Sequence, residues 1–201
     1  MRLSPARLSS CLSALSLALA IGAEPDLKPI FTGTDLTGWK VPDGNDAAGW
    51  YKAIDGVLKI QSDASKVGSV LWTEQSYHDF VISFDFQFGE GVIDTGIHLR
   101  NQDQIQIGIS GSLKRDMTGS PYVGGKYPVE AKGVADLLKP KEWNSMKIEA
   151  RGMHYLVWLN GQQVLDFTST TGIPEGPIGI QLHGGKDMGV EYRNIKLAEL
   201  K

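Results

Sequence analysis

The sequence predicts an all-β protein built as two antiparallel sheets packed face to face. Short β-branched and aromatic runs recur along the chain and are bounded by turn residues, and the whole chain has 24 glycines. The run at residues 79–88, DFVISFDFQF, alternates apolar and polar side chains as a half-buried strand does. Roughly ten or more such strands, without runs of helical periodicity, favour a two-sheet sandwich.

Residues 1–23 are typical of a secretory signal peptide. A short basic region with two arginines precedes an apolar run at residues 11–21 that is too short to span a bilayer. Small residues follow, with Ala18 and Ala20 in an A-x-A arrangement. We therefore expect an exported protein, periplasmic or secreted, in which residues 24–201 form a single domain. The alternative is an uncleaved anchor helix.

Cleavage would leave an acidic chain without cysteine. The formal charge falls from −3 to −5 with the loss of the two leader arginines, and the single cysteine, Cys11, is lost as well. Disulfide and thiol chemistry are then not expected, so stability must come from a hydrophobic core. The acidic balance and the lack of a basic cluster argue against nucleic acid or an anionic membrane as a partner. No later stretch is long and apolar enough to span a membrane.

The expected strands follow one another with turn signals between them. They cover residues 50–61 around the Asp55-Gly56 turn, then 79–88, 94–109, 144–152, 153–167 around the Asn160-Gly161 turn, 176–184 and 188–200. Residues 110–142 form a connection far longer than an ordinary loop, and such connections are usually functional or disordered. Tyr122 and Tyr127 favour an ordered lid, with room for a short helix near residues 133–138.

The segment 94–109, DTGIHLRNQDQIQIGI, carries aliphatic side chains in one register and polar side chains in the other. Burying an unpaired arginine would cost several kcal/mol, so the aliphatic register must face the interior. The same rule applies to residues 176–184. The residues expected on the outer face are His98, Arg100, Gln104, Gln106, Gln181 and His183. Such planar, directional groups suit sugar hydroxyls or a carbonyl oxygen, although an ordinary solvated face is the alternative.

Seven short segments, in order along the chain, resemble motifs of the 3-keto-disaccharide hydrolase family, formerly a domain of unknown function. They are FTGTDLTGWK, SYHDFVISFDFQF, DTGIHLRNQDQIQI, EWN, VWLNG, GPIGIQLHGG and VEYRNIKL. The resemblance covers about residues 27–200. It implies an exported jelly-roll sandwich of the concanavalin A-like lectin/glucanase type that acts on 3-keto sugars. Two residues depart from the family pattern: Thr95 where Ser is frequent, and Gln104 where many members carry Glu. The second departure removes a carboxylate that could serve as a base or a metal ligand.

A mechanism for such substrates needs a base and a donor for an oxyanion. A ketone at C3 acidifies the proton on C2, and its removal gives an enediolate that expels the substituent at C1 before water adds. The paired carboxylates of an ordinary glycosidase are not required, and no obvious pair occurs here. His98 or His183 fits the base, because imidazole titrates near neutrality. Arg100, which is always charged, suits the oxyanion.

The remaining candidates would hold the sugar. They are Gln104, Gln106 and Gln181 on the sheet, and Tyr122, Lys126 and Tyr127 in the lid. Each candidate has a structural alternative: either histidine could be merely hydrogen-bonded, and Arg100 could pair with Asp94 or Glu191. Two histidines with one of those carboxylates could also hold a divalent metal ion, although no tight spacing such as H-x-x-x-H occurs.

The sequence thus favours an exported 3-keto-glycoside hydrolase that works by elimination and hydration. A sugar oxidoreductase would have to act upstream, because the 3-keto substrate must be made by oxidation. A non-catalytic carbohydrate-binding module using the same groove is the main alternative, and a scaffold of the cell envelope is a third. A sandwich fold does not decide between them, because a fold does not imply a function.

Overall fold

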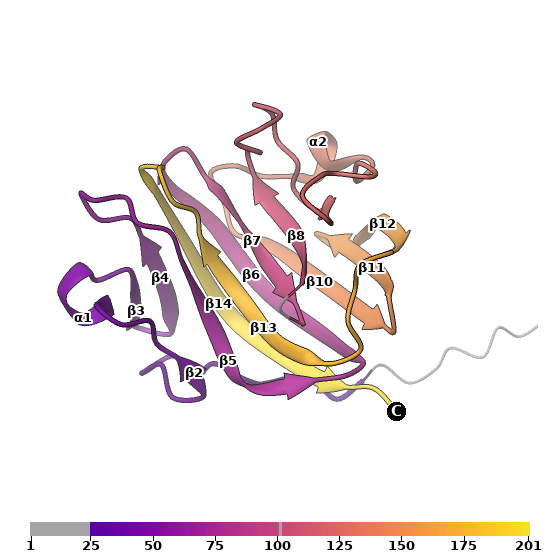
Figure 1. The fold of residues 1–201 in the computed structure, drawn as a ribbon, viewed down its shortest axis with the longest axis horizontal. Helices are drawn as coiled ribbons and strands as arrows, with labels where there is room; N and C mark the ends of the chain where they lie inside the picture. The colour runs from indigo at the N-terminus through magenta and orange to yellow at the C-terminus, as the bar shows by residue number, and fades with distance from the viewer. Residues whose placement is uncertain (1–24, 101) are drawn as a thin grey trace, which may run out of the picture.

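Two antiparallel sheets face each other and enclose the hydrophobic core (Figure 1). The computed structural model describes residues 25–100 and 102–201. The predicted all-β jelly-roll sandwich is confirmed. The expected signal peptide, residues 1–23, lies outside the described residues, and export remains a prediction. In the part of the chain that is described, no helix has the length and apolarity needed to cross a membrane.

Sheet A has eight strands in the order β12-β11-β10-β6-β14-β4-β3, with β1 added beside β14. Its strands are β1 (Lys28–Pro29), β3 (Tyr51–Ile54), β4 (Val57–Gln61), β6 (Phe80–Gly91), β10 (Asn144–Arg151), β11 (His154–Leu159), β12 (Gln162–Thr168) and β14 (Met188–Glu199). The longest strands, β6 and β14, pair with each other at the centre of this sheet.

Sheet B has six strands in the order β2-β5-β13-β7-β8-β9. Its strands are β2 (Trp39–Lys40), β5 (Ser69–Tyr77), β7 (Asp94–Leu99), β8 (Asp103–Gly108), β9 (Pro121–Tyr122) and β13 (Gly176–Leu182). The pairing joins segments that are far apart in sequence: Ile180 of β13 lies opposite Ile97 of β7, and Ile97 lies opposite Ile105 of β8. The three central strands β13, β7 and β8 carry most of the expected site.

The aliphatic register of these strands faces the core, as predicted. The inward residues, all at most 1% exposed, are Ile97, Leu99, Ile105, Ile107, Ile178, Ile180 and Leu182. Sheet A contributes the facing layer, which includes Phe80, Ile82, Phe84 and Phe86. Because successive side chains of a strand point to opposite faces, the positions between these residues are directed outward.

Residues 110–142 are ordered and lie beside the end of β8 (Figure 1). The segment includes β9 and a short helix, α2 (Val134–Leu137), where a short helix was expected. The other helix, α1 (Asn45–Ala48), lies near β3 and β4. The hydrogen bonds from Gln106 N to Ser120 O (2.9 Å) and from Lys132 N to Val164 O (2.8 Å) tie the long segment to the sandwich.

Arg100 lies inside the molecule, so its predicted position on the outer face is wrong. β7 ends at Leu99, and Arg100 has a φ of 55°, so the alternation of the strand no longer sets its direction. Its side chain is 0% exposed. The guanidinium donates to the carbonyl oxygens of His78 (2.5 Å), Ala150 (3.2 Å), Gly152 and Ile173 (3.5 Å), and pairs with Asp79 (3.2 Å).

Ala150 belongs to β10, whereas the other four partners belong to connections between strands, so Arg100 joins three of these connections. His78 and Asp79 connect β5 to β6, Gly152 connects β10 to β11, and Ile173 lies between β12 and β13. Many donors on one planar group can satisfy several carbonyls at once, which an ammonium does less well. The role of Arg100 is structural.

Replacing Arg100 by Met should lower the free energy of unfolding by about 3–5 kcal/mol, because four carbonyls and Asp79 lose a buried partner. Urea unfolding followed by circular dichroism measures the change. Arg151→Met is the matched control, since Arg151 is half exposed beside Glu149 and its pair should contribute less than about 1 kcal/mol. Equal losses in the two variants would contradict the structural role.

Candidate functional site

A polar hollow of about 400 Å³ lies on the outer face of sheet B. It is bounded by β7, β8, the segment after β13 and the first part of the 110–142 segment. Six of the nine residues expected from the sequence line it: Gln104, Gln106, Tyr122, Tyr127, Gln181 and His183. Asp94 and Lys186 line it as well. A hollow of this size can hold a monosaccharide unit.

Three glutamines meet at the floor of the hollow. Gln104 Nε2 donates to Gln106 Oε1 (3.2 Å) and to Gln181 Oε1 (3.1 Å). The glutamine amides meet above Gly96, the residue of β7 that lies opposite Gln106. A Cβ on Gly96 would lie 2.2 Å from Gln104 Nε2, so the absence of a side chain is what allows these amides to meet. Each amide keeps further hydrogen-bonding capacity for a ligand.

Asp94 is a buried carboxylate held from one side only. Gln106 Nε2 donates to its Oδ1 (2.9 Å), which fixes the carboxylate in the hollow. The residue is 3% exposed, and Oδ2 has no hydrogen-bond partner among the described residues. An unpaired buried oxygen of this kind is costly for the fold, and such costs concentrate at functional sites.

Two groups that can carry positive charge face the free oxygen of Asp94. His183 Nε2 lies 3.8 Å from Asp94 Oδ2, and Lys186 Nζ lies 4.0 Å from it. His183 Nδ1 lies 2.7 Å from the carbonyl oxygen of Gly184. Because a carbonyl only accepts, Nδ1 must carry the proton, and Nε2 of the neutral ring keeps its lone pair toward the hollow.

Tyr122 and Tyr127 form an aromatic wall of the hollow. Their ring centroids are 5.0 Å apart with an interplanar angle of 56°. Burial raises the pKa of the Tyr127 hydroxyl, and the nearby charge of Asp94 raises it further, although Ser110 acts in the opposite direction. Tyr127 is therefore a neutral hydrogen-bonding group at ordinary pH.

His98 lies on the outer face of sheet B, as expected, but it does not line the hollow. It packs against Trp72, with ring centroids 5.2 Å apart, and its Nε2 is buried without a partner among the described residues. Gly179 makes room for this pair, because a Cβ there would lie 2.5 Å from the Trp72 ring. Burial lowers the pKa of His98 to about 4, so the ring is neutral and a weak base. These contacts favour the structural alternative for His98.

Lys126 and Arg100 are the other two expected residues that the hollow does not include. Lys126 is exposed in the turn that follows Val123, with which it forms a bridge. The cation of the hollow is Lys186, whose side chain is 22% exposed. Sequence reasoning missed Lys186 because it lies in the connection between β13 and β14, beyond the strand pattern. Asp94 was considered as an ion-pair partner of Arg100 and as a possible metal ligand, although it shares the register of Gly96 and His98.

The metal-binding alternative required both histidines beside Asp94 or Glu191. His98 lies under Trp72, and Glu191 belongs to sheet A, where it pairs with Lys59 (3.2 Å). Within residues 25–100 and 102–201, no three His, Cys, Asp or Glu side chains are grouped so that they could hold a metal ion. Of the expected set, only Asp94 and His183 lie close together.

The sandwich and its outer hollow define a concanavalin A-like β-protein with a polar site on one sheet. The family model described as the 3-keto-alpha-glucoside-1,2-lyase-like domain matches residues 26–198. The chain belongs to this family, which confirms the resemblance found in its sequence motifs. No curated protein sequence matches the chain.

Solved structures share the fold at low sequence identity. Two proteins of Parabacteroides distasonis, both provisionally assigned as glycosyl hydrolases, are similar to this chain. The first has 22% identity and a TM-score of 0.66, covering 87% of this chain and 94% of its own. The second has 24% identity and a TM-score of 0.64, covering 87% and 100%. The carbohydrate-binding module CBM66 of Bacillus subtilis has 16% identity and a TM-score of 0.57, covering 81% and 96%.

The stability of the protein should decrease as the pH falls from about 6.5 to about 4, partly because of His98. Its folded-state pKa is lowered, so only the unfolded chain takes up the proton in this window, at up to about 1.4 kcal/mol per pH unit. Urea unfolding of the wild type and of His98→Gln at several pH values isolates the effect, because the variant lacks this loss. A His98 ring that titrates near 6.5 by NMR would contradict the prediction.

Proposed function

We propose that this protein cleaves 3-keto-glycosides or 3-keto-disaccharides by elimination followed by hydration. The observation that carries the proposal is Asp94, a buried carboxylate whose Oδ2 has no partner and faces His183 and Lys186. A base, a carboxylate and a cation around one hollow suit proton abstraction beside a carbonyl group. Membership of a family described by a 3-keto-glucoside lyase supports this reaction class.

His183 is the proposed base for the proton on C2. Its Nδ1 is held by the Gly184 carbonyl, which leaves the lone pair on Nε2 for the substrate. When Nε2 takes the proton, the imidazolium lies 3.8 Å from Asp94 Oδ2, whose negative charge stabilises it. Gln106 holds the other carboxylate oxygen, so Asp94 is oriented before the substrate binds.

Lys186 takes the role for which the sequence suggested Arg100. Its ammonium would stabilise the negative charge that develops on the C3 oxygen as the enediolate forms. The side chain is mostly buried, and a partly desolvated charge acts more strongly than a solvated one. The free hydrogen-bonding groups of Gln104 and Gln181 would bind sugar hydroxyls, and the Tyr122–Tyr127 pair would flank the ring.

The proton and the electrons balance over the two stages. In elimination, the electrons of the C2–H bond form a C1=C2 double bond by way of the enediolate, and the C1–O bond breaks. The leaving oxygen takes the proton from the imidazolium, which restores the neutral base. In hydration, water adds its oxygen to C1 and a proton to C2, so the net reaction is hydrolysis. Upstream, the substrate requires a sugar oxidoreductase that forms a ketone at C3, and export of the chain would place the reaction outside the cytoplasm.

A non-catalytic carbohydrate-binding module is the second candidate. The same three amides and the tyrosine pair could hold sugar hydroxyls without any reaction. The likeness to a carbohydrate-binding module of Bacillus subtilis agrees with this candidate, though at 16% identity it concerns the fold. Turnover is what separates the two.

Release of p-nitrophenol from its 3-keto-glucoside by the full chain tests the proposed reaction. Each of Asp94→Asn, His183→Gln and Lys186→Met should reduce kcat/KM by about 10²- to 10⁴-fold, because each removes one charge or base from the transition state. The loss should fall mainly on kcat, since the glutamine amides that bind the sugar remain.

Matched variants outside the hollow control for general effects. His154→Gln alters a histidine that also faces a carboxylate, Asp166 (2.7 Å), and Lys126→Met removes a lysine of the lid. Both should keep turnover within about twofold, as surface changes usually do. Full turnover in Asp94→Asn and His183→Gln would refute the site. Sugar binding without turnover in the wild type would favour the binding module.

A further inference from the structure

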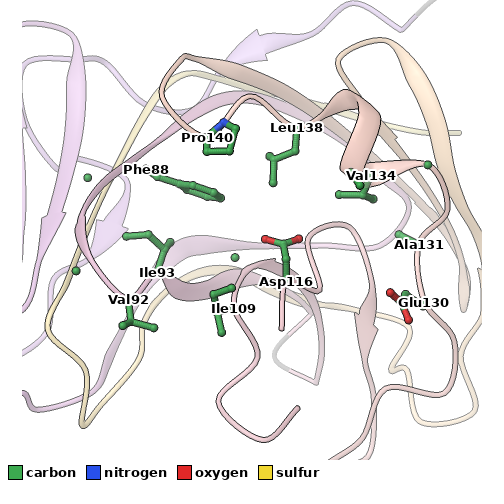
Figure 2. Close-up of a pocket in the computed structure, with 15 residues that line it drawn as sticks. Phe88, Val92, Ile93, Ile109, Asp116, Glu130, Ala131, Val134, Leu138 and Pro140 are labelled. Carbon is green, nitrogen blue, oxygen red and sulfur yellow. The ribbon is translucent and has the colours of Figure 1, made fainter. Parts of the chain in front are cut away.

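A second cavity, about 760 Å³ in volume, opens at the end of the sandwich beneath the segment that carries α2. Figure 2 shows Phe88, Ile93, Ile109, Val134, Leu138 and Pro140 around it. Phe88 comes from β6 of sheet A, whereas Ile109 directly follows β8 of sheet B. The cavity therefore lies where the two sheets separate and the core is not closed by side chains. Its volume and apolar walls are those of small-molecule sites.

One carboxylate points into these apolar walls. Figure 2 shows the Asp116 carboxylate directed into the middle of the cavity, below Leu138 and Val134. Thr118 donates to it from its backbone N (3.0 Å) and from Oγ1 (3.2 Å). These two bonds fix its orientation but leave lone pairs on both oxygens. Burial raises the pKa of Asp116, although the bonds from Thr118 oppose the shift.

No cationic side chain lines this cavity among the described residues. Its other acidic residue, Glu130, already pairs with Arg115 (2.5 Å) on the exposed side. Asp116 has no ion pair within the described part of the chain. A carboxylate held in apolar surroundings without a counter-charge is unfavourable, and a bound cation would relieve this cost.

We propose that this cavity binds a compact apolar cation, a molecule of one or two hydrocarbon rings that carries one ammonium group. The rings would fill the space between Phe88, Ile109 and Leu138, and the ammonium would bond to Asp116. Charge complementarity selects this class over an apolar acid, which Asp116 would repel. It also selects it over a plain hydrocarbon, which would leave the carboxylate unpaired.

The site is separate from the polar hollow. The paired ends of β7 and β8 separate the two. Asp94 and Gln106 in these strands line the hollow, whereas Ile93 and Ile109, which directly flank the strands, line the cavity. The hydrogen bond from Ile109 N to Ile93 O (2.6 Å) closes the backbone between them. Both sites are nevertheless walled by the 110–142 segment, so a ligand in the cavity would stabilise the segment that supplies Tyr122 and Tyr127.

The test is a ¹H–¹⁵N NMR titration of the full chain with 1-naphthylmethylamine, 1-naphthalenemethanol and 1-naphthoate. The amine should bind most tightly and the carboxylate least, with shifts centred on the amides of Ile93, Ile109 and Val134. Asp116→Asn should raise the Kd of the amine about tenfold, the loss of one charge-assisted bond, and leave the Kd of the alcohol within about twofold. Val134→Trp should block both ligands by filling the space.

Leu113→Trp is the control for Val134→Trp, because it adds the same ring to an exposed residue of the same segment. It should leave amine binding unchanged. The proposal is overturned if the amine binds no better than the alcohol, or if Asp116→Asn keeps that preference. Shifts centred on Gln181 and His183 would also overturn it, because the amine would then occupy the polar hollow. Activity on a 3-keto-glucoside does not enter these readouts, so failure here is distinguishable from failure of the proposed function.

Discussion

The alternation of side chains on three adjacent strands, β13, β7 and β8, is the constraint on which the rest of this structure depends. The inward register supplies aliphatic residues that pack against the phenylalanines of sheet A. The same geometry then obliges the intervening residues to project from the outer face. Since the strands are in register, these outward residues stand in rows, and glutamines from two different strands reach each other over Gly96.

The outer face becomes a site because it is covered. The 110–142 segment folds over the end of sheet B, so Gln104 and Gln106 are 4% and 2% exposed although they point away from the core. Their burial lowers the local dielectric response and makes the unpaired oxygen of Asp94 a strong electrostatic feature. Hydrogen bonds run from Gln181 through Gln104 and Gln106 to Asp94, and they offset part of the free-energy cost of burying this carboxylate. His183 and Lys186 lie opposite its charge.

Asp94 and Asp116 are both held in apolar or covered surroundings, and their neighbours differ. Asp94 faces two groups that can carry positive charge, which suits a reaction in which charge moves. Asp116 faces mainly apolar side chains, has no ion pair among the described residues and is bonded by Thr118, which suits the recognition of a ligand that brings its own charge. The 110–142 segment lines both, so it links the polar hollow to the apolar cavity.

Sequence periodicity was sufficient for the strands, the inward residues and four residues of the hollow, because side-chain direction within a strand follows from local geometry. It failed for Arg100, whose positive φ begins a turn. It placed His98 on the outer face but could not show that Trp72 of β5, on the far side of β13, covers it. It also missed Lys186, which lies in the connection between β13 and β14. Within the strands, the sequence by itself determined which side chains face outward. Only the tertiary structure decided which of them meet, because burial, coverage and the direction of a turn residue depend on segments distant in the chain.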